Sequence, residues 1–293
     1  MPGTANRPVP RKPARSLLPP VDPQRFVPTL ERPVRAKLRH LEPDTEITPH
    51  SHAWAQVVVC ATGVARITAG HSTYLVPAWR AVWIPPQVEH LVTVVEAAEL
   101  RTLYVHQEAG RVGPGVPREA GAAWRGCRVL EVSALLRELV LQMNVGMDGS
   151  GALAPDALER ERRLGDLALD ELRRAAPVRL GIELPHDKRL RALCEAVLQQ
   201  PARHATLEGW ARETAASPRT VARLFREQLD TSFGPWRQQV LLAHALRLAA
   251  QGRPMRLIAA ELGYASPSAF SAMVRRAVGQ PPSRFFAPPP EAA

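Results

Sequence analysis

The stretch Ser217-Pro218-Arg219-Thr220 returns 49 residues later as Ser266-Pro267-Ser268-Ala269, and the residues that follow keep this offset. In each copy the serine can accept a backbone N–H as a helix N-cap. The proline then stands at the first helical position, where a missing N–H costs nothing. After each cap, apolar residues recur at intervals of three and four, which is typical of a helix with one buried face. We therefore expect two copies of a helix-turn-helix unit, at about residues 206–227 and 255–276.

A short amphipathic run precedes each cap and is expected to form the first helix of its unit. These runs contain Trp210, Ala211 and Thr214 in the first copy and Ile258, Ala259 and Leu262 in the second. Gly263 stands where a left-handed turn residue would end the run of the second copy. The first copy has Ala215 at the corresponding place, and its turn is shorter by one residue.

A buried helix is expected between the two units. Phe233-Gly234-Pro235 interrupts the chain, and an apolar stripe follows at helical spacing: Trp236, Val240, Ala243, Leu246 and Ala250. A helix of about 16 residues spans roughly 25 Å at about 1.5 Å per residue. Successive major grooves on one face of DNA lie about 34 Å apart. A stiff spacer of this length could hold two recognition helices near adjacent grooves.

Together these features resemble the C-terminal DNA-binding region of the AraC/XylS family of bacterial transcriptional regulators, over roughly residues 187–287. The matching residues are Ser217-Pro218-Arg219-Thr220, Ser232-Phe233-Gly234, Ala259 with Leu262-Gly263-Tyr264, Ser266-Pro267-Ser268-Ala269-Phe270, and Gly279 followed by Pro282 and Phe285. Val274 occupies a place where the family usually has Phe. The resemblance implies an all-α domain over residues 186–287 that binds a double-stranded DNA operator.

The second helix of each unit is expected to contact the DNA. Affinity should come mostly from arginines that neutralise phosphates, and sequence choice from side chains near the start of the helix. Arg219 and Arg223 suit guanine, because a guanidinium matches the O6/N7 edge of that base. The second copy has small side chains at the equivalent places, so the first copy should carry more of the base specificity. Arg226, Arg275 and Arg276 lie further along and are expected at phosphates. The full set of expected DNA-binding residues is Ser217, Arg219, Thr220, Arg223, Arg226, Ser266, Ser268, Ala269, Ser271, Arg275 and Arg276.

Charge is unevenly distributed along the chain, whose formal net charge is +10. Residues 1–40 carry +7, residues 41–200 carry −3 and residues 201–287 carry +7. A neutral-to-acidic middle between two basic segments is typical of a sensing domain joined to a part that meets phosphate. A general bias of the genome toward Arg is the alternative explanation of the excess.

The cysteine and hydropathy patterns favour the cytoplasm as the location of the protein. Cys60, Cys127 and Cys194 have no paired spacing, so neither a disulfide framework nor a zinc motif is expected. No apolar stretch of signal-peptide length opens the chain, and no apolar run has the length of a membrane span. We therefore expect a cytoplasmic protein with no membrane partner. Residues 1–30 are basic and rich in Pro, and they are expected to be a disordered tail.

Short β-rich segments dominate the next part of the chain. They lie at residues 57–60, 64–67, 72–76, 81–84 and 91–95, with Gly and Pro between them. Spacing of roughly 8–12 residues predicts a small antiparallel barrel, which we place over residues 31–110.

Inside this region, His50-Ser51-His52 with Gln56, and the later run Pro85-Pro86-Gln87-Val88-Glu89-His90, resemble the two cupin motifs. His50, His52 and His90 fall on the histidine positions, while Gln56 replaces the usual Glu and Gln87 the usual Gly. Strand alternation would put His50 and His52 on the same face.

The sequence allows three interpretations of this histidine group: a metal site, an effector pocket or a structural role. Three imidazoles and the carboxamide of Gln56 could hold a divalent metal, but the missing carboxylate removes a charge that would favour the cation. The same side chains could line an effector pocket, with Trp54, Trp79 and Trp83 as an aromatic wall, or could be purely structural. No cofactor is expected to be required. The run from Trp79 to Pro85 resembles AraC-type regulators whose N-terminal domain is a cupin.

Residues 111–185 are expected to connect the two domains. Two amphipathic helices are predicted at about Ser133–Met143 and Pro155–Ala175, followed by a linker at residues 176–185. In the resembled family such helices help the barrel to dimerise, so a homodimer is expected. Simple packing against the barrel is the alternative.

The sequence thus predicts a two-domain protein, with an all-β cupin-like barrel followed by helices and then an all-α domain of two helix-turn-helix units joined by a long helix. We expect a sequence-specific transcriptional regulator, not an enzyme, controlled by a small-molecule effector and with RNA polymerase as a candidate partner. The alternatives are a cupin metalloenzyme with a DNA-binding appendage and a ligand-free architectural DNA binder. The scattered positions of the remaining histidines count against catalysis.

Overall fold

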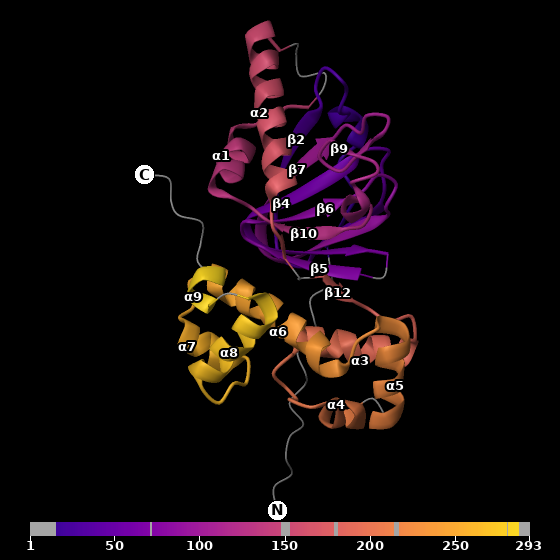
Figure 1. Ribbon diagram of the computed structural model, residues 1–293, viewed down its shortest axis with the longest axis vertical. Coiled ribbons are helices and arrows are strands. Elements are labelled where there is room, and N and C mark those ends of the chain that lie inside the picture. The colour runs from indigo at the N-terminus through magenta and orange to yellow at the C-terminus, as the bar shows by residue number, and fades with distance from the viewer. Residues whose placement is uncertain are drawn as a thin grey trace, which may run out of the picture.

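The computed structural model describes residues 16–70, 72–147, 153–178, 181–213, 217–279 and 281–286. Figure 1 shows a β-rich N-terminal domain and, below it, a helical C-terminal domain. This arrangement confirms the predicted fold class. No helix in the described ranges is both long and apolar enough to cross a bilayer.

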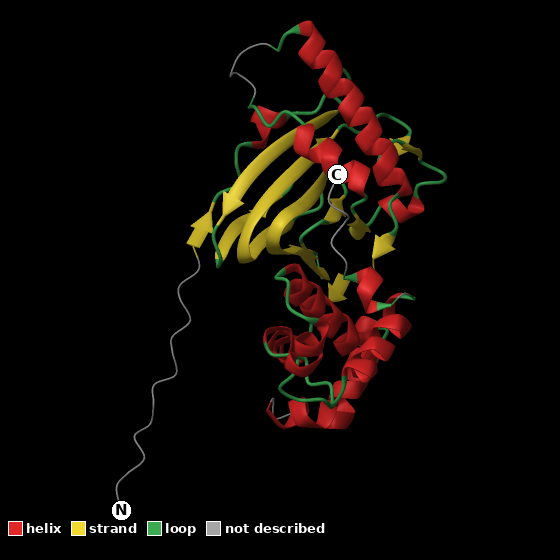
Figure 2. Ribbon diagram, turned by 90° about the vertical axis from the view of Figure 1, so that its left-hand side faces the viewer, coloured by secondary structure: helices red, strands yellow, loops and turns green. Residues whose placement is uncertain are grey.

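The N-terminal domain is a ten-stranded sheet that curves strongly on itself (Figure 2). The strands follow the order β1-β3-β7-β4-β6-β10-β11, while β2 pairs with β7, and β5 pairs with β4 and β12. The bounds of these strands are β1 Ser16–Leu18, β2 Val34–Leu41, β3 Thr45–His50, β4 Ala55–Ala69, β5 Ser72–Pro77, β6 Arg80–Ile84, β7 His90–Val105, β10 Arg128–Glu131, β11 Pro177–Val178 and β12 Gly181–Glu183. A separate hairpin joins β8 (Arg111–Val112) to β9 (Val116–Pro117).

Two long strands, β4 and β7, form the spine of this sheet. The sequence predicted two strands where β4 runs unbroken, because Gly63 looked like a turn residue. Gly63 instead has φ +74° at a register shift between β4 and β7. A Cβ atom there would lie 2.0 Å from the carbonyl oxygen of Ala97, so glycine lets the paired strands bend together.

Alternation along these strands sends side chains to two different cores. Val57, Val59 and Trp83 form one core with the helices that follow the sheet. Val58 and Ile84 belong to the other core, which continues into the C-terminal domain. The sheet therefore has no solvent-exposed face along its central strands.

Two helices cover the outer face of the sheet, α1 (Ala134–Gln142) and α2 (Pro155–Arg174). Ser133 caps α1 by accepting from the N–H of Leu136. On α2, Gly165 lies against Val34 of β2, and a Cβ at Gly165 would come within 3.2 Å of that side chain. These close contacts position α2 on the sheet.

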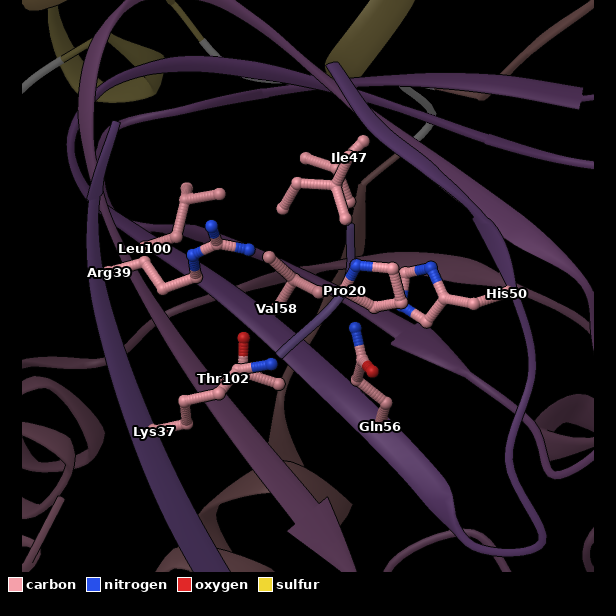
Figure 3. A pocket seen from close by; sticks show the side chains of 10 residues that line it. Pro20, Lys37, Arg39, Ile47, His50, Gln56, Val58, Leu100 and Thr102 are labelled. Atoms are coloured by element: carbon pink, nitrogen blue, oxygen red, sulfur yellow. The ribbon is translucent and has the colours of Figure 1, made fainter. Parts of the chain in front are cut away.

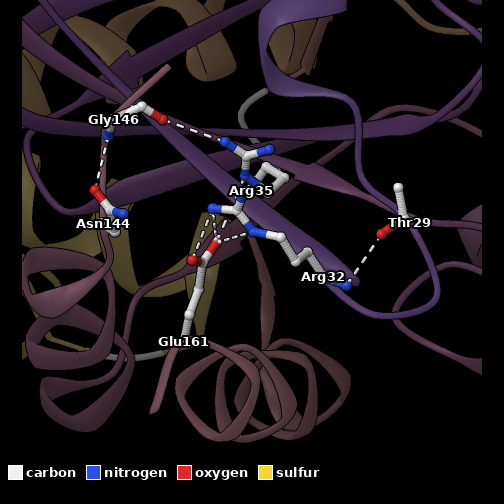
Figure 4. A network of polar contacts seen from close by, with 6 residues as sticks. All are labelled: Thr29, Arg32, Arg35, Asn144, Gly146 and Glu161. Carbon is white, nitrogen blue, oxygen red and sulfur yellow. Dashed lines mark hydrogen bonds and ion pairs between the residues drawn. The ribbon is translucent and has the colours of Figure 1, made fainter. Parts of the chain in front are cut away.

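A buried carboxylate also ties α2 to the sheet (Figure 4). Glu161 is 6% exposed and receives Arg32 Nη2 at 2.8 Å, with Arg35 Nε at 3.5 Å. Arg35 also donates to the carbonyl of Gly146 at 3.2 Å. A buried charge is tolerated only when it is paired in this way, so Glu161 fixes α2 relative to β2.

The predicted disordered tail is wrong for its described part. Residues 1–15 lie outside the described residues, but Ser16–Leu18 forms β1 and pairs in parallel with β3. A 3-10 helix, Pro23–Phe26, follows and buries Phe26 against the ring of Tyr104. The basic, Pro-rich composition of this segment gave no indication that Phe26 would be buried. The pairing of β1 with β3 joins residues distant in sequence, so a local sequence pattern does not predict it.

The predicted boundary between barrel and connector also needs correction. Strand β10 pairs with β6, and both β11 and β12 join the sheet from the segment predicted as a linker. A short 3-10 helix, Ala122–Trp124, precedes β10. Strands of two to four residues carry too few side chains to show alternation, so only the finished sheet reveals them.

The C-terminal domain contains two helix-turn-helix units and a helix before, between and after them. The first unit is α4 and α5, and the second is α7 and α8. The bounds are α3 Lys188–Gln199, α4 Leu207–Glu213, α5 Pro218–Leu229, α6 Phe233–Ala250, α7 Met255–Glu261, α8 Pro267–Val278 and α9 Pro282–Phe285. Gly263 has φ +79° and ends α7 as predicted. Thr214 and Ala215, on which the first turn depends, lie outside the described residues, as does the side chain of Ala250.

The spacer helix α6 is buried on more sides than the predicted stripe requires. Leu241, Leu242 and Leu248 are buried as well as Trp236 and Val240. The extra burial arises because α6 packs between the two units and also contacts β4, β5 and β12 of the sheet. A helix that is apolar nearly all round is expected in such a position.

Candidate functional site

The recognition helix of the first unit, α5, presents its polar face to solvent. Ser217 caps it by accepting from the N–H of Thr220 at 3.1 Å. Val221, Phe225 and Leu229 are buried, and this apolar face orients the helix. The opposite face carries the predicted DNA contacts, all of them exposed: Ser217, Arg219, Thr220, Arg223 and Arg226.

One of these arginines has an acidic partner on its own helix. Arg223 Nη1 donates to Glu227 Oε1 at 2.7 Å, one turn along the helix. Both side chains are more than half exposed. Such pairs contribute about 0.3–0.5 kcal/mol, so a base or phosphate can displace Glu227 easily. Arg219 is therefore the better-placed base-reading residue of the two.

The second recognition helix, α8, repeats this arrangement with smaller side chains. Ser266 caps it by accepting from the N–H of Ala269 at 3.2 Å, and its hydroxyl also contacts that of Ser268. Phe270, Met273 and Val274 are buried. Exposed on the other side are Ser268, Ala269, Arg275 and Arg276, while Ser271 is half-buried.

Further basic residues lie near the first helix of each unit and were not predicted. Arg212 is exposed on α4, and Arg253 and Arg256 are exposed at the start of α7. In helix-turn-helix proteins the first helix crosses the DNA backbone, so these side chains are candidates for phosphate contacts. The net positive charge of residues 201–287 was the feature of the sequence that could have indicated these additional phosphate contacts.

In the barrel, the structure brings the three predicted histidines together. His50 ends β3 and pairs directly with His90 at the start of β7. The ring centroids of His50 and His90 are 4.4 Å apart, and those of His52 and His90 are 5.3 Å apart. One nitrogen from each ring lies within 4.8 Å of the others.

Backbone carbonyls orient all three rings. Nδ1 of His50 lies 2.8 Å from the carbonyl of Thr48, and Nδ1 of His90 lies 3.0 Å from that of Val88. His52 makes a longer contact, 3.4 Å, with the carbonyl of Trp54. If Nδ1 carries the proton in each contact, Nε2 is left with its lone pair.

These rings are held in their neutral form. Burial lowers the pKa of His52 to about 4 and that of His90 to about 3, and it also lowers the pKa of His50. The Nε2 atoms of His52 and His90 are buried and have no hydrogen-bond partner among the described residues. Neutral imidazoles with free, converging nitrogens are suitable donors for a metal such as Zn²⁺.

A small hollow lies beside this cluster, inside the curved sheet (Figure 3). His50 and Gln56, two of the residues predicted for an effector or metal site, line it. His52, His90 and Trp54 do not line it. The hollow contains about 350 Å³ of empty space, including its open side, and is lined by Pro20, Lys37, Arg39, Ile47, His50, Gln56, Val58, Val92, Leu100 and Thr102.

The two cations of this hollow, Lys37 and Arg39, were not predicted from the sequence. Lys37 and Arg39 alternate with Ala36 and Leu38 on β2, so they share one face of the strand. Cations at every second position of a strand, as at Lys37 and Arg39, could have predicted that this face of the strand lines a polar interior. Burial lowers the pKa of Lys37 to about 8, and Arg39 adds to the effect.

Of the three tryptophans predicted as an aromatic wall, Trp54 lies beside the histidines, whereas Trp79 and Trp83 pack with the core on the other face of the sheet. The ring of Trp54 stacks on that of His52 at 5.6 Å. Trp83 is fully buried on the opposite face of the sheet, where its Nε1 donates to the carbonyl of Trp124 at 3.0 Å. The prediction for Trp83 is wrong because Gln56 pairs with Ile84, so residue 83 points to the other side.

Comparison with known proteins agrees with this geometry. A helix-turn-helix domain family matches residues 210–287, and the family described as AraC-like ligand binding domain matches residues 36–176. The HTH-type transcriptional regulator NimR of Escherichia coli K12 is 30% identical over 238 residues, which are 81% of this chain and 81% of NimR. The arabinose operon regulatory protein of Salmonella typhimurium LT2 is 29% identical over 118 residues, 40% of this chain and 42% of that protein.

Among solved structures, fatty-acid-bound ToxT of Vibrio cholerae is 12% identical, and the match covers 86% of this chain and 94% of ToxT. Its TM-score of 0.34 is too low for any residue's role to be transferred. The two capped recognition helices and the ligand-binding domain model together define a DNA-binding transcriptional regulator. The chain belongs to the AraC/XylS family of these regulators.

Proposed function

We propose that the chain reads a double-stranded operator with α5 and α8 and that a small molecule in the barrel controls this binding. The observation that supports the first part most directly is the exposure of Arg219 and Thr220 at the capped start of α5. Base specificity comes mainly from Arg219 and Arg223. The arginines of α8 contact phosphates.

The route from the barrel to the DNA-binding units is supported by contacts of a single strand, β7. This strand supplies Leu100 and Thr102 to the hollow. It also supplies Glu96, whose Oε1 lies 2.9 Å from Arg247 Nη1 on the spacer helix and which accepts from Gln251. A ligand that shifts β7 therefore acts on α6, which positions both units.

A second contact reaches the other end of the DNA-binding domain. Arg80 at the start of β6 is 6% exposed, and its Nη2 donates to the carbonyl of Phe285 at 3.2 Å. The guanidinium also lies over the Phe285 ring and 3.7 Å from Glu131 of β10. Control by ligand requires two arrangements with different ligand affinities, and these interdomain contacts are the ones that must differ between them.

Replacing Glu96 by Gln tests this coupling. Loss of the ion pair with Arg247 should change the operator affinity of the chain several-fold, because coupling free energies between sites are typically about 1–3 kcal/mol. The operator is first obtained by selecting bound fragments from the source genome. Affinity is then measured by fluorescence anisotropy for E96Q, R247M and the double variant, which should be non-additive.

Glu99→Gln is the matched control for this experiment. Glu99 lies on the same strand, has the same 22% side-chain exposure, and pairs with Arg101, which also contacts the carbonyl of Val140 on α1. It should leave operator affinity unchanged. Equal effects of E96Q and E99Q, or none from either, would remove the proposed route.

A divalent metal at the histidine cluster is the second candidate for the barrel. The unpartnered Nε2 atoms of His52 and His90 favour it, while the nearby Lys37 and Arg39 and the absence of a carboxylate from the set oppose it. We propose that no metal is required for operator binding. Metal analysis of the purified chain would find a resident metal at close to one ion per chain, and operator affinity measured after chelation tests whether that metal is required.

The proposed assembly is a homodimer in the cytoplasm. Its support is the pair of leucines, Leu135 on α1 and Leu167 on α2, each 51% exposed on the helices that cover the sheet. RNA polymerase is proposed as a partner when the chain is bound beside a promoter. The relatives are transcriptional regulators, and the metalloenzyme alternative is not favoured.

A further inference from the structure

We propose that the hollow in the barrel binds the carboxylate group of a small organic anion, held between Lys37 and Arg39. This inference names the chemical class of the effector, so it rests on the proposed control by ligand. It follows from the charges, the hydrogen bonding and the shape of the hollow.

The charge of the hollow is positive and uncompensated. Among the described residues that line it, two are cations and none is Asp or Glu. Lys37 is 8% exposed, and its ammonium group donates to the neutral hydroxyl of Tyr104. Nη1 of Arg39 is shielded from solvent and has no acceptor in the described part of the chain.

Two cations without a counter-ion are costly where they are withdrawn from water, and here Lys37 is buried and Arg39 is half-buried. The depressed pKa of Lys37 reflects this cost, since burial and the charge of Arg39 both oppose protonation. A bound carboxylate would offset both effects and would supply acceptors to Lys37 and Arg39 through charge-assisted hydrogen bonds. A divalent cation in the same space would add to the repulsion.

The neutral groups of the hollow extend the match. Gln56 points toward His50 in Figure 3, and its carboxamide lines the hollow. Thr102 lies beside Lys37 in the same view. These groups can complete the hydrogen bonding of a carboxylate, or of a hydroxyl next to it.

The remaining walls are apolar and set the size of the ligand. Ile47, Val58, Val92 and Leu100 line the hollow together with Pro20, and Leu100 is the cross-strand neighbour of Arg39. The hollow contains about 350 Å³ of empty space, including its open side. The ligand is therefore small, with a charged end between Lys37 and Arg39 and a compact apolar body against the four aliphatic side chains.

Matched pairs of carboxylates and their amides test the inference on the full chain. The probes are acetate and acetamide, isobutyrate and isobutyramide, and benzoate and benzamide, measured by calorimetry at pH 7 and low ionic strength. We expect at least one carboxylate to bind at least tenfold more tightly than its amide. Lys37→Met and Arg39→Met should each lower that affinity at least tenfold, while Arg39→Lys, which keeps the charge, should retain part of it.

Two controls separate ligand binding from folding. Without ligand, the K37M chain should melt at the same or a higher temperature, because an apolar side chain replaces a buried uncompensated charge. Arg118→Met changes an exposed arginine of the same domain away from the hollow and should leave carboxylate affinity unchanged. Equal affinity for amide and carboxylate in every pair, or full affinity in both K37M and R39M, would overturn the inference.

Operator affinity, measured on the same samples, separates this inference from the control by ligand. A carboxylate that binds through Lys37 and Arg39 without changing operator affinity would support the anion site and refute control by ligand. A neutral compound that changes operator affinity while no carboxylate binds would refute the anion site and support control by ligand.

Discussion

Replacing Arg219 by Ala should weaken operator binding by a factor of about 5 to 150 and abolish the preference for guanine at one position of the site. The expected loss corresponds to the roughly 1–3 kcal/mol by which a bidentate Arg–guanine pair discriminates against other bases. Arg219 follows the capping Ser217 at the exposed start of α5, which is where a recognition helix enters the major groove. Competition binding against operators mutated at each position would measure the change.

Arg226→Ala is the matched comparison for Arg219. Arg226 is also exposed on α5 but lies nearly two turns further along the helix. Its loss should weaken binding to all sequences alike and reduce the dependence of log K on log salt concentration by about 1. An R219A chain that keeps the base preference of the parent protein would remove Arg219 from the readout.

Replacing Trp83 by Ala should lower the free energy of unfolding by about 3–5 kcal/mol, the usual cost of deleting a buried aromatic side chain. Trp83 is fully buried, contacts the ring of Trp124 at 5.3 Å and donates a hydrogen bond to the Trp124 carbonyl. Trp83→Phe retains much of the ring and loses the hydrogen bond, so a smaller cost is expected. Urea denaturation followed by circular dichroism gives both values.

Trp54→Phe provides the contrast on the histidine side of the sheet. Trp54 is half-buried, so its replacement should cost less stability than the loss of Trp83. Carboxylate affinity should be unchanged in W83F, since Trp83 points away from the hollow. Full stability of W83A, or lost carboxylate affinity in a folded W83F chain, would contradict the structural role given to Trp83.

Local chemistry explains what the sequence could predict. The caps at Ser217 and Ser266 and the turn at Gly263 depend on residues within a few positions, so their pattern could be read directly. The meeting of His50 with His90 was also predictable, although from resemblance to known motifs. The distances between these rings depend on the pairing of β3 with β7, so they could be known only from the structure.

Non-local pairing explains what could not be predicted. Alternation showed that residues 83 and 84 face opposite ways, but only the pairing of Gln56 with Ile84 shows which of them shares the histidine side. Lys37 and Arg39 can be assigned to the hollow only once the pairing of β2 with β7 is known. The short strands β1 and β12 depend entirely on partners distant in sequence.

The central claim is that two helix-turn-helix units of one chain occupy adjacent major grooves on the same face of DNA. The spacer helix α6 has 18 residues, and at about 1.5 Å per residue it spans roughly 27 Å. A spacer of this length fits two contacts about one helical turn apart.

Hydroxyl-radical footprinting of the intact chain on a selected operator would show whether both units bind in this way. We expect two protected segments on one face of the duplex, about 10 base pairs apart. One of the two segments is protected by α8, and its protection should disappear in a double variant with Arg275→Ala and Arg276→Ala. A single protected segment in the parent chain, or two segments on opposite faces of the duplex, would contradict the account.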